Sequence, residues 1–388
     1  MKQIFLLFGF LILSFSTLFA QKSSAIHSAI KNRSEITELR IVRPNPQDSV
    51  LMDSICLLEN LETFEVLNCQ WKRLPECIGV LQSVKKINLF KNDITELPDG
   101  FCQLLALEDF SMWLNGLTKL PEDFGELESL TNLDLYMNSL TSLPKSIGEL
   151  SNLKYLNLSI NKLTTIPKSI GKLKALESLN LSENQLVRLP ENLGKMKSLS
   201  TLQLSKNQLT TLPSSLSLLG NLEELSVEGN QLKEIPESIG KLSNLKYLTI
   251  GNNPIQTLPD SIINLKNLYR LNVSKTKITR LPSNIGNLKS LNTLKIFDNQ
   301  LTELPASFGD LENLEFIELY NNQLTDLPES FGKLQNLKIL SLANNKFTSI
   351  PKALFELKRL NTLVLLGNDI PEEEIEALKA ALPFCKIR

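Results

Sequence analysis

The sequence predicts an α/β repeat solenoid, in which short parallel strands stack into a concave sheet and 3₁₀ or extended segments return on the convex side. Three observations predict this fold. Aliphatic residues recur with a period of 23 from Leu61 onward, Asn fills one position of the period in twelve of fourteen units, and Pro fills another in thirteen. A fixed period of this length is typical of chains in which each unit stacks on the next.

The strand of each unit is expected at positions 3 to 7 of the repeat, counted from Leu61 in the first copy. Aliphatic residues at positions 4 and 6 alternate with polar ones at 3, 5 and 7, which indicates one buried face. Asn at position 9 is expected to bond backbone groups where the chain leaves the strand, because its amide both donates and accepts. Pro at position 15 and Gly at position 19 leave no room for a long helix on the return path.

These columns resemble the leucine-rich repeat family. One clean copy reads Leu153, Leu156, Leu158, Asn161, Leu163, Ile166, Pro167, Ile170, Gly171, Leu173. Its Leu-or-Ile-Pro step and its Ile-Gly-x-Leu ending are similar to the 23-residue class of Ras-pathway scaffold proteins and plant disease-resistance receptors. The resemblance covers residues 61–368 and implies a leucine-rich-repeat horseshoe. It implies little about function, because function lies in the surface that the fold presents.

The first residues read as an export signal, expected at residues 1–20. Lys2 supplies the positive start, an apolar run follows from Ile4 to Leu13, and Ala20 marks the cleavage point. The alternative is an uncleaved membrane anchor, but the uncharged stretch is short against the roughly 20 apolar residues of a spanning helix. The protein is therefore predicted to be secreted or to lie in the cell envelope.

Both ends of the array are expected to carry caps, because terminal repeats would otherwise expose their core. Residues 21–60 are predicted to form the N-terminal cap, in which Ile36, Leu39 and Ile41 copy positions 1, 4 and 6. Residues 369–388 are predicted to form a C-terminal cap helix after Pro371, followed by an edge strand.

Five cysteines follow the leader, namely Cys56, Cys69, Cys77, Cys102 and Cys385. Two interpretations stand side by side. The favoured one is that they are buried free thiols, because their spacings match no metal motif and one must stay unpaired. The other is a disulfide that fastens the N-terminal cap, for which Cys56 with Cys77 is the first pair to test.

Charge and composition exclude several function classes. The chain has 41 Lys and Arg against 42 Asp and Glu, so a nucleic-acid or polybasic membrane surface is not expected. His27 is the single histidine, which argues against a Ser–His–Asp triad and a multi-histidine metal site. No phosphate-binding glycine loop is present. We therefore expect no catalytic residue, metal or cofactor, and no membrane contact beyond the leader.

Aromatic residues gather unevenly on the predicted concave face. The candidate ligand-binding residues are Phe90, Trp113, Leu114, Tyr136, Met137 and Tyr155, with Ile160 beside them, and a second group of Phe297, Phe316 and Tyr320. Exposed aromatic and Met side chains dominate binding hot spots. The other interpretation is that the rings only stack on one another and stabilise neighbouring strands. For the first group both interpretations stand, and for the second group stacking is favoured.

The sequence thus predicts an exported, non-enzymatic repeat protein that binds a protein partner on its concave face. Two alternatives stay open, an intracellular-type signalling scaffold and a protein that recognises a cell-surface polysaccharide through its aromatic residues.

Overall fold

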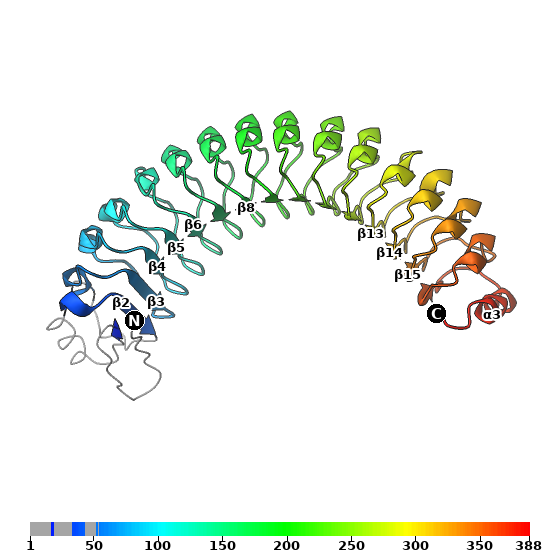
Figure 1. The fold of residues 1–388 in the computed structure, drawn as a ribbon, viewed down its shortest axis with the longest axis horizontal. Coiled ribbons are helices and arrows are strands. Elements are labelled where there is room, and N and C mark those ends of the chain that lie inside the picture. The colour runs from blue at the N-terminus through cyan, green and yellow to red at the C-terminus, as the bar shows by residue number, and fades with distance from the viewer. Residues whose placement is uncertain (1–16, 19–32, 43–51, 53) are drawn as a thin grey trace. The chain divides into compact units, whose positions relative to one another are not determined.

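A computed structural model describes residues 17–18, 33–42, 52 and 54–388. The described residues up to Leu186 form a first compact unit, and residues 187–388 form a second. In each unit the strands lie side by side along the inner edge, and the 3₁₀ turns form the outer edge (Figure 1). The predicted repeat solenoid of parallel strands and short 3₁₀ returns is confirmed. Among the described residues, no helix is both long enough and apolar enough to cross a membrane.

The sheet of the first unit is parallel, and neighbouring strands pair residues one repeat apart, as in Lys86 with Asp109 and Asp109 with Asn132. Its strands are β1 (Thr17–Leu18), β2 (Glu38–Val42), β3 (Thr63–Leu67), β4 (Lys86–Asn88), β5 (Asp109–Ser111), β6 (Asn132–Asp134), β7 (Tyr155–Asn157) and β8 (Ser178–Asn180). Apart from β1, which pairs with β2, the predicted export signal lies outside the described residues and stays a prediction.

The return segments of the first unit are 3₁₀ turns. They are η1 (Arg33–Glu35), η2 (Ile55–Leu57), η3 (Glu76–Val80), η4 (Asp99–Gln103), η5 (Phe124–Glu126), η6 (Lys145–Glu149) and η7 (Lys168–Lys172). Most begin directly after the repeat's proline, such as Pro144 before η6. Each such proline is the cap residue before its turn, with φ fixed by its ring, and its carbonyl accepts an N–H of the turn, as that of Pro144 accepts the N–H of Ile147 at 3.2 Å.

The second unit repeats the pattern. Its strands are β9 (Thr201–Gln203), β10 (Glu224–Ser226), β11 (Tyr247–Thr249), β12 (Arg270–Asn272), β13 (Thr293–Lys295), β14 (Phe316–Glu318), β15 (Ile339–Ser341), β16 (Thr362–Val364) and β17 (Lys386–Ile387). Its turns are η8 (Glu191–Lys195), η9 (Ser214–Leu218), η10 (Glu237–Lys241), η11 (Asp260–Asn264), η12 (Ile285–Asn287), η13 (Ala306–Asp310), η14 (Glu329–Lys333) and η15 (Lys352–Glu356).

The C-terminal residues form a helix and a short strand. The helix α3 (Glu372–Ala381) follows Pro371, and its first turn carries Glu372, Glu373 and Glu374, where acidic side chains suit the positive end of the helix dipole. Leu378 is fully buried on its inner side. The strand β17 then pairs with β16.

A column of buried asparagines joins consecutive repeats, as the sequence predicted for position 9. Asn138 shows the pattern: its Nδ2 donates to the carbonyl oxygens of Met112 (2.7 Å) and Leu135 (3.1 Å), and its Oδ1 accepts the N–H of Leu117 (3.0 Å). Two repeats depart from it. Cys69 substitutes its weakly donating Sγ, and Thr276 donates its hydroxyl to the side chain of Asn299.

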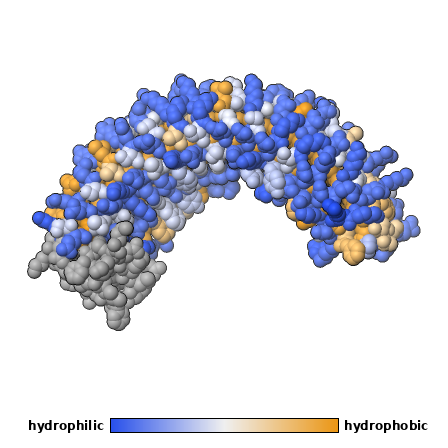
Figure 2. Space-filling view, in the orientation of Figure 1, coloured by the Kyte–Doolittle hydropathy of each residue, from blue (hydrophilic) through white to orange (hydrophobic). Residues whose placement is uncertain are grey.

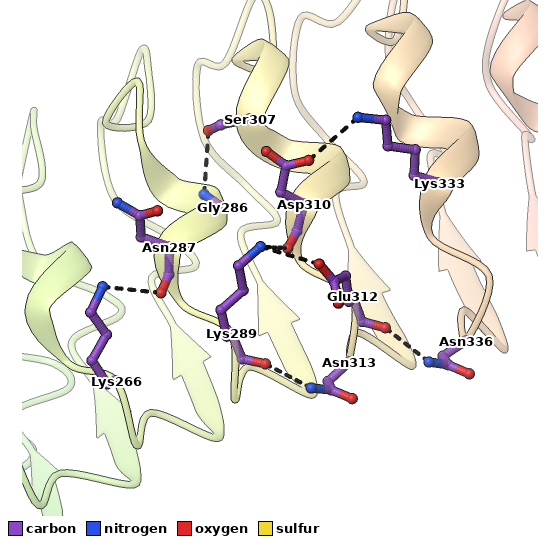
Figure 3. A network of polar contacts seen from close by, with 10 residues as sticks. All are labelled: Lys266, Gly286, Asn287, Lys289, Ser307, Asp310, Glu312, Asn313, Lys333 and Asn336. Atoms are coloured by element: carbon purple, nitrogen blue, oxygen red, sulfur yellow. Dashed lines mark hydrogen bonds and ion pairs between the residues drawn. The ribbon is translucent and has the colours of Figure 1, made fainter.

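A second column of amides lies at the last position of the repeat, and the sequence did not predict its role. Its Nδ2 atoms donate to a carbonyl 24 residues earlier, as from Asn313 to Lys289 (2.8 Å) and from Asn336 to Glu312 (2.9 Å) (Figure 3). In the same network the ammonium of Lys289 bonds the carbonyl of Asp310 and the carboxylate of Glu312. This second column ties the return segments together, as the first ties the strands.

Glycine at position 19 suits the close approach of successive 3₁₀ turns in most units, whereas Cys102, Ser217, Ile263 and Phe355 fill the position in the others. A Cβ atom on Gly148 would lie 2.2 Å from the carbonyl oxygen of Ser169 in the next turn. By contrast, a Cβ atom on Gly220 would meet no atom within 4 Å. The sequence signal at position 19 therefore reports tight stacking of the outer layer as well as the end of each turn.

Candidate ligand-binding surface of the first unit

The aromatic column of the first unit consists of Phe90, Trp113 and Tyr136, which follow β4, β5 and β6. The ring centroids of Phe90 and Trp113 lie 3.9 Å apart in a stacked arrangement, and those of Trp113 and Tyr136 lie 6.2 Å apart and tilted. All three side chains are half-buried, so each keeps an exposed part. Stacking and an accessible face therefore coexist in this column.

The apolar stripe, which consists of Leu114, Met137 and Ile160, borders the aromatic column at the next position of the repeat. These three residues have positive φ values of 59°, 56° and 53°, in the left-handed region. Their backbone N–H groups continue the sheet ladder, for example from Leu114 to the carbonyl of Tyr136 at 3.0 Å. The ladder therefore holds the backbone in a conformation that costs an L-residue roughly 1–2 kcal/mol, and more for a β-branched one.

The same backbone position in the second unit carries mostly residues that adopt a left-handed conformation easily. They are Gly229, Asn252, Asp298, Asn321, Asn344 and Gly367, with Lys206 and Lys275 as the others. Two of the amides also bond along the column, from Asn344 to Asn321 (2.7 Å) and from Asn321 to Asp298. The fold alone thus favours Asn, Asp or Gly here, and the apolar stripe departs from that preference in three successive repeats.

A polar strip of side chains from β4 to β7 lies beside the aromatic column. The carboxylate of Asp109 forms an ion pair with the ammonium of Lys86 at 3.9 Å and accepts a hydrogen bond from the Nδ2 of Asn132 at 2.9 Å. Asp134 lies on the neighbouring strand, and its Oδ1 accepts the backbone N–H of Tyr136 at 3.0 Å. Among the described residues, no Lys or Arg forms an ion pair with Asp134.

Burial raises the pKa of the Asp134 carboxyl. The hydrogen bonds from Tyr136 and Asn157 act in the opposite direction, and the nearby charge of Asp109 adds to the increase. The carboxylate is thus partly desolvated, and its charge is not neutralised by the part of the chain that the structure describes.

Tyr155, the sixth predicted residue of this group, lies at the start of β7 and not in the aromatic column. Its side chain is 37% exposed. Burial raises the pKa of its hydroxyl, the charge of Asp134 adds to this, and a hydrogen bond with Asn157 lowers it. Tyr155 therefore belongs to the polar strip around Asp134.

The predicted aromatic group of the second unit has a different character. Phe297 and Tyr320 stack almost in parallel, with centroids 4.5 Å apart and planes 7° apart. Phe316 begins β14, next to an ion pair of 3.1 Å between Lys295 and Glu318. The position after each of the two stacked rings carries Asp298 or Asn321 and no apolar residue. This arrangement is what cross-strand stabilisation alone requires.

Two exposed tyrosines were not among the predicted residues. Tyr247 and Tyr269 meet edge-on at 6.2 Å, and they are 39% and 42% exposed. Tyr269 precedes β12 at a position outside the strand, which the alternation rule does not assign to the concave face.

The structure joins Cys56 and Cys77 in a disulfide with Cα atoms 6.0 Å apart, and Cys69, Cys102 and Cys385 keep their sulfur atoms as thiols. The sequence had favoured free thiols throughout and held this pair as the alternative. Burial raises the pKa of the Cys102 thiol to about 12, with further increases from Glu126, Asp123 and Asp99, so it stays protonated at neutral pH. In the described ranges, no group of three or more His, Cys, Asp or Glu side chains is placed to hold a metal ion.

The outer surface seen in Figure 2 is largely hydrophilic, with apolar residues scattered over it. Exposed aliphatic residues such as Val80, Leu105 and Leu218 lie on or beside the 3₁₀ turns, and some exposed apolar residues are normal for a protein surface. The aromatic column and apolar stripe are different because they combine neighbouring rings with an apolar border beside the strands.

The comparisons with known proteins identify repeats directly. A leucine-rich repeat model matches residues 128–186, 221–278 and 266–324, and a model of two leucine-rich repeat copies matches residues 312–353. No curated protein sequence gives a significant match to the chain.

Solved structures of leucine-rich repeat proteins are similar over most of the chain. A leucine-rich repeat protein from Leptospira interrogans is 32% identical, with 95% of this chain and 99% of that chain covered and a TM-score of 0.86. The plant peptide hormone receptor RGFR1, in complex with RGF2, is 28% identical, with 92% and 62% covered and a TM-score of 0.74.

A third similar structure is the leucine-rich repeat ectodomain of the membrane receptor kinase GASSHO1 from Arabidopsis thaliana, in complex with Casparian strip integrity factor 2. It is 29% identical, with 92% of this chain and 44% of that chain covered and a TM-score of 0.64. The chain thus spans less than two thirds of either plant receptor structure. Because the bacterial relative matches along nearly its whole length, the chain belongs to the leucine-rich repeat family.

Proposed function

We propose that this protein is an exported, non-enzymatic binding protein that holds a protein partner on the strand face of the first unit. The partner lies against the aromatic column and the apolar stripe. Leucine-rich repeat domains serve as protein-interaction modules, and the two plant structures above contain bound partners. The proposal for this chain goes further, because it names the unit and the residues.

The observation that carries the proposal is the apolar stripe. Leu114, Met137 and Ile160 occupy left-handed positions where the other repeats carry Gly, Asn, Asp or a charged side chain and no apolar residue. Met137 is 41% exposed, so packing within the chain does not account for it. The left-handed backbone recurs along the chain, so the residue type is what sets these three repeats apart, and neighbouring apolar side chains on a surface mark interaction sites.

Mutual stacking of the rings does not explain the stripe. A ring ladder would need only the aromatic column, as the pair Phe297 and Tyr320 shows, since that pair is followed by Asp298 and Asn321. The second unit therefore serves as an internal comparison, in which rings stack without an apolar border.

Export is supported by three features. The first residues have the pattern of a signal peptide, with Lys2 before an apolar run that starts at Ile4. The disulfide between Cys56 and Cys77 suits an oxidising compartment, because thiols are kept reduced in the cytosol. One similar structure is the ectodomain of a membrane receptor kinase.

The test compares two forms of the chain as immobilised baits, the wild type and the double variant Leu114→Asn/Met137→Asn. Each is incubated with surface extract of the source organism, before and after protease digestion of that extract. We expect the wild type to retain a polypeptide that the double variant does not retain and that digestion removes. A ligand that survives digestion identifies a glycan instead, and equal retention by both baits contradicts the proposed site.

A matched control is the variant Asn321→Ala/Asn344→Ala, which alters the same backbone position in the second unit. It should retain the partner as the wild type does. Circular dichroism of all three proteins verifies that the solenoid is intact before binding is compared.

A further inference from the structure

We propose that Asp134 binds a Lys or Arg side chain of the partner, whose aliphatic part lies against the rings of Trp113 and Tyr136. The proposal rests on the proposed function, because it names the chemistry of the ligand at the same surface. The partner would then carry a basic residue next to the apolar residues that contact the apolar stripe.

The first step is the charge on this surface. Asp109 and Asp134 lie on adjacent strands, and one lysine, Lys86, reaches Asp109 at 3.9 Å. Asp134 has hydrogen-bond donors, the N–H of Tyr136 and the side chain of Asn157, but no cation of the described chain forms an ion pair with it. The carboxylate of Asp134 is thus held by hydrogen bonds alone on a half-buried surface, where charge is poorly solvated.

The second step is the placement of that charge next to the rings. Asp134 and Ser111 are paired across the sheet, and Trp113 follows Ser111 by two residues, as Tyr136 follows Asp134. From strand geometry, the Cα atoms of Trp113 and Tyr136 lie about 8 and about 7 Å from that of Asp134. A cation held by the carboxylate therefore lies within reach of a ring face, where it is attracted by the π system within about 6 Å of the centroid.

The fold does not require an acidic residue at the position of Asp134. Three other strands of the first unit carry Asn at the corresponding position, and the Oδ1 atoms of Asn88, Asn157 and Asn180 accept the same backbone N–H two residues on, at 3.0–3.1 Å. Asn makes the turn without the desolvated charge, so Asp134 adds a charge that local structure does not use. A cationic group of the ligand would neutralise that charge.

The variant Asp134→Asn therefore removes the charge while keeping the hydrogen bond, because the chain already uses Asn for the same hydrogen bond in other repeats. The matched control is Asp298→Asn, which removes one negative charge from the second unit. Both variants are expected to fold as the wild type does, which circular dichroism verifies.

The experiment selects binders from a phage-displayed random peptide library on the full wild-type chain, with counter-selection on Leu114→Asn/Met137→Asn. We expect the retained peptides to be enriched in Lys or Arg beside aromatic or aliphatic residues. Asp134→Asn should weaken their binding about tenfold, and Asp298→Asn should leave it within twofold. The Asp134 effect should shrink as salt is raised, because salt screens charge pairs at a surface.

Two failures are distinguishable. Peptides that depend on Leu114 and Met137 but lack basic residues, or that bind Asp134→Asn as well as the wild type, overturn the role of Asp134 and leave the proposed function standing. A selection without any peptide that depends on Leu114 and Met137 counts against the proposed function itself, and with it against the inference.

Discussion

Replacing Ile160 by Asn should stabilise the protein, although the change exchanges an aliphatic side chain for an amide. Ile160 has φ 53°, and its N–H donates to the carbonyl of Ser182 at 3.0 Å, so the sheet ladder keeps it in the left-handed region. A β-branched residue pays about 2 kcal/mol for that conformation, at the upper end of the range for L-residues, whereas Asn adopts it readily.

The opposing term is the loss of apolar contacts. Full burial of an Ile side chain contributes about 1.5–3 kcal/mol, and because Ile160 is only half-buried, its loss costs about 1 kcal/mol. The two terms leave a net stabilisation of about 1 kcal/mol. With a urea dependence of about 3 kcal/mol per molar, the unfolding midpoint should rise by about 0.3 M.

The assay is urea unfolding followed by circular dichroism, with the reciprocal variant Asn252→Ile as control. Asn252 has φ 51° and an exposed side chain, so an Ile there should lower the free energy of unfolding by about 1–2 kcal/mol. If Ile160→Asn instead lowers stability by 1 kcal/mol or more, the side chain is held by packing, and the argument that the stripe exists for a ligand fails.

Three further changes test other parts of the fold. Gly148→Ala should destabilise the folded protein by about 2 kcal/mol, because its Cβ would overlap a carbonyl oxygen at 2.2 Å. Gly220→Ala should be neutral or slightly stabilising, because its Cβ would meet no atom within 4 Å. Thermal unfolding compares the two variants. Asn138→Ala should cost about 2–3 kcal/mol in urea unfolding, since it leaves buried backbone groups without partners, and a loss below 1 kcal/mol would refute the role of the column. Burial raises the pKa of Asp134 in the folded state above the value of 3.8 that it has in the unfolded state. Between these two pKa values the folded state binds more protons than the unfolded state. The contribution of Asp134 to the free energy of unfolding therefore falls as the pH rises through this range. Asp134→Asn should therefore be more stable than the wild type at pH 7, and this advantage should vanish at a pH below 3.8, as measured by urea unfolding at both values.

The elements that repeat could be predicted from the sequence because the same physical requirement recurs in every unit. Leu156 and Leu158 alternate with polar residues as a half-buried strand demands, and Pro167 limits the return to a short turn. The asparagine column was predictable for the same reason, since an amide is needed wherever buried backbone carbonyls and N–H groups face each other across repeats.

The features that were missed depend on contacts between repeats. The left-handed conformation is marked by Gly229 and Asn252 in the second unit, but Leu114 and Ile160 obscure that signal in the first. Likewise, a surface amide such as Asn313 is ordinary in sequence, and its partner 24 residues earlier becomes apparent only when the turns are stacked.

The sequence named the residues of the candidate site but not the contacts between them. The aromatic column was named correctly as neighbouring side chains, yet the sequence could not say whether Phe90 and Trp113 touch. Tyr155 was included in the same candidate group from another position of the repeat, and the structure adds that its hydroxyl senses the charge of Asp134. The unneutralised charge of Asp134 escaped notice because it depends on which cation reaches which carboxylate.

The bonds between neighbouring repeats all span nearly the same stretch of chain: 26 residues from Asn161 to Leu135, 21 from Leu140 to Asn161 and 24 from Asn152 to Glu128. Excising 23 residues within one unit would bring equivalent partners back into the same relation. Gene duplication and unequal crossing-over of whole repeats can therefore lengthen or shorten this protein without changing its fold.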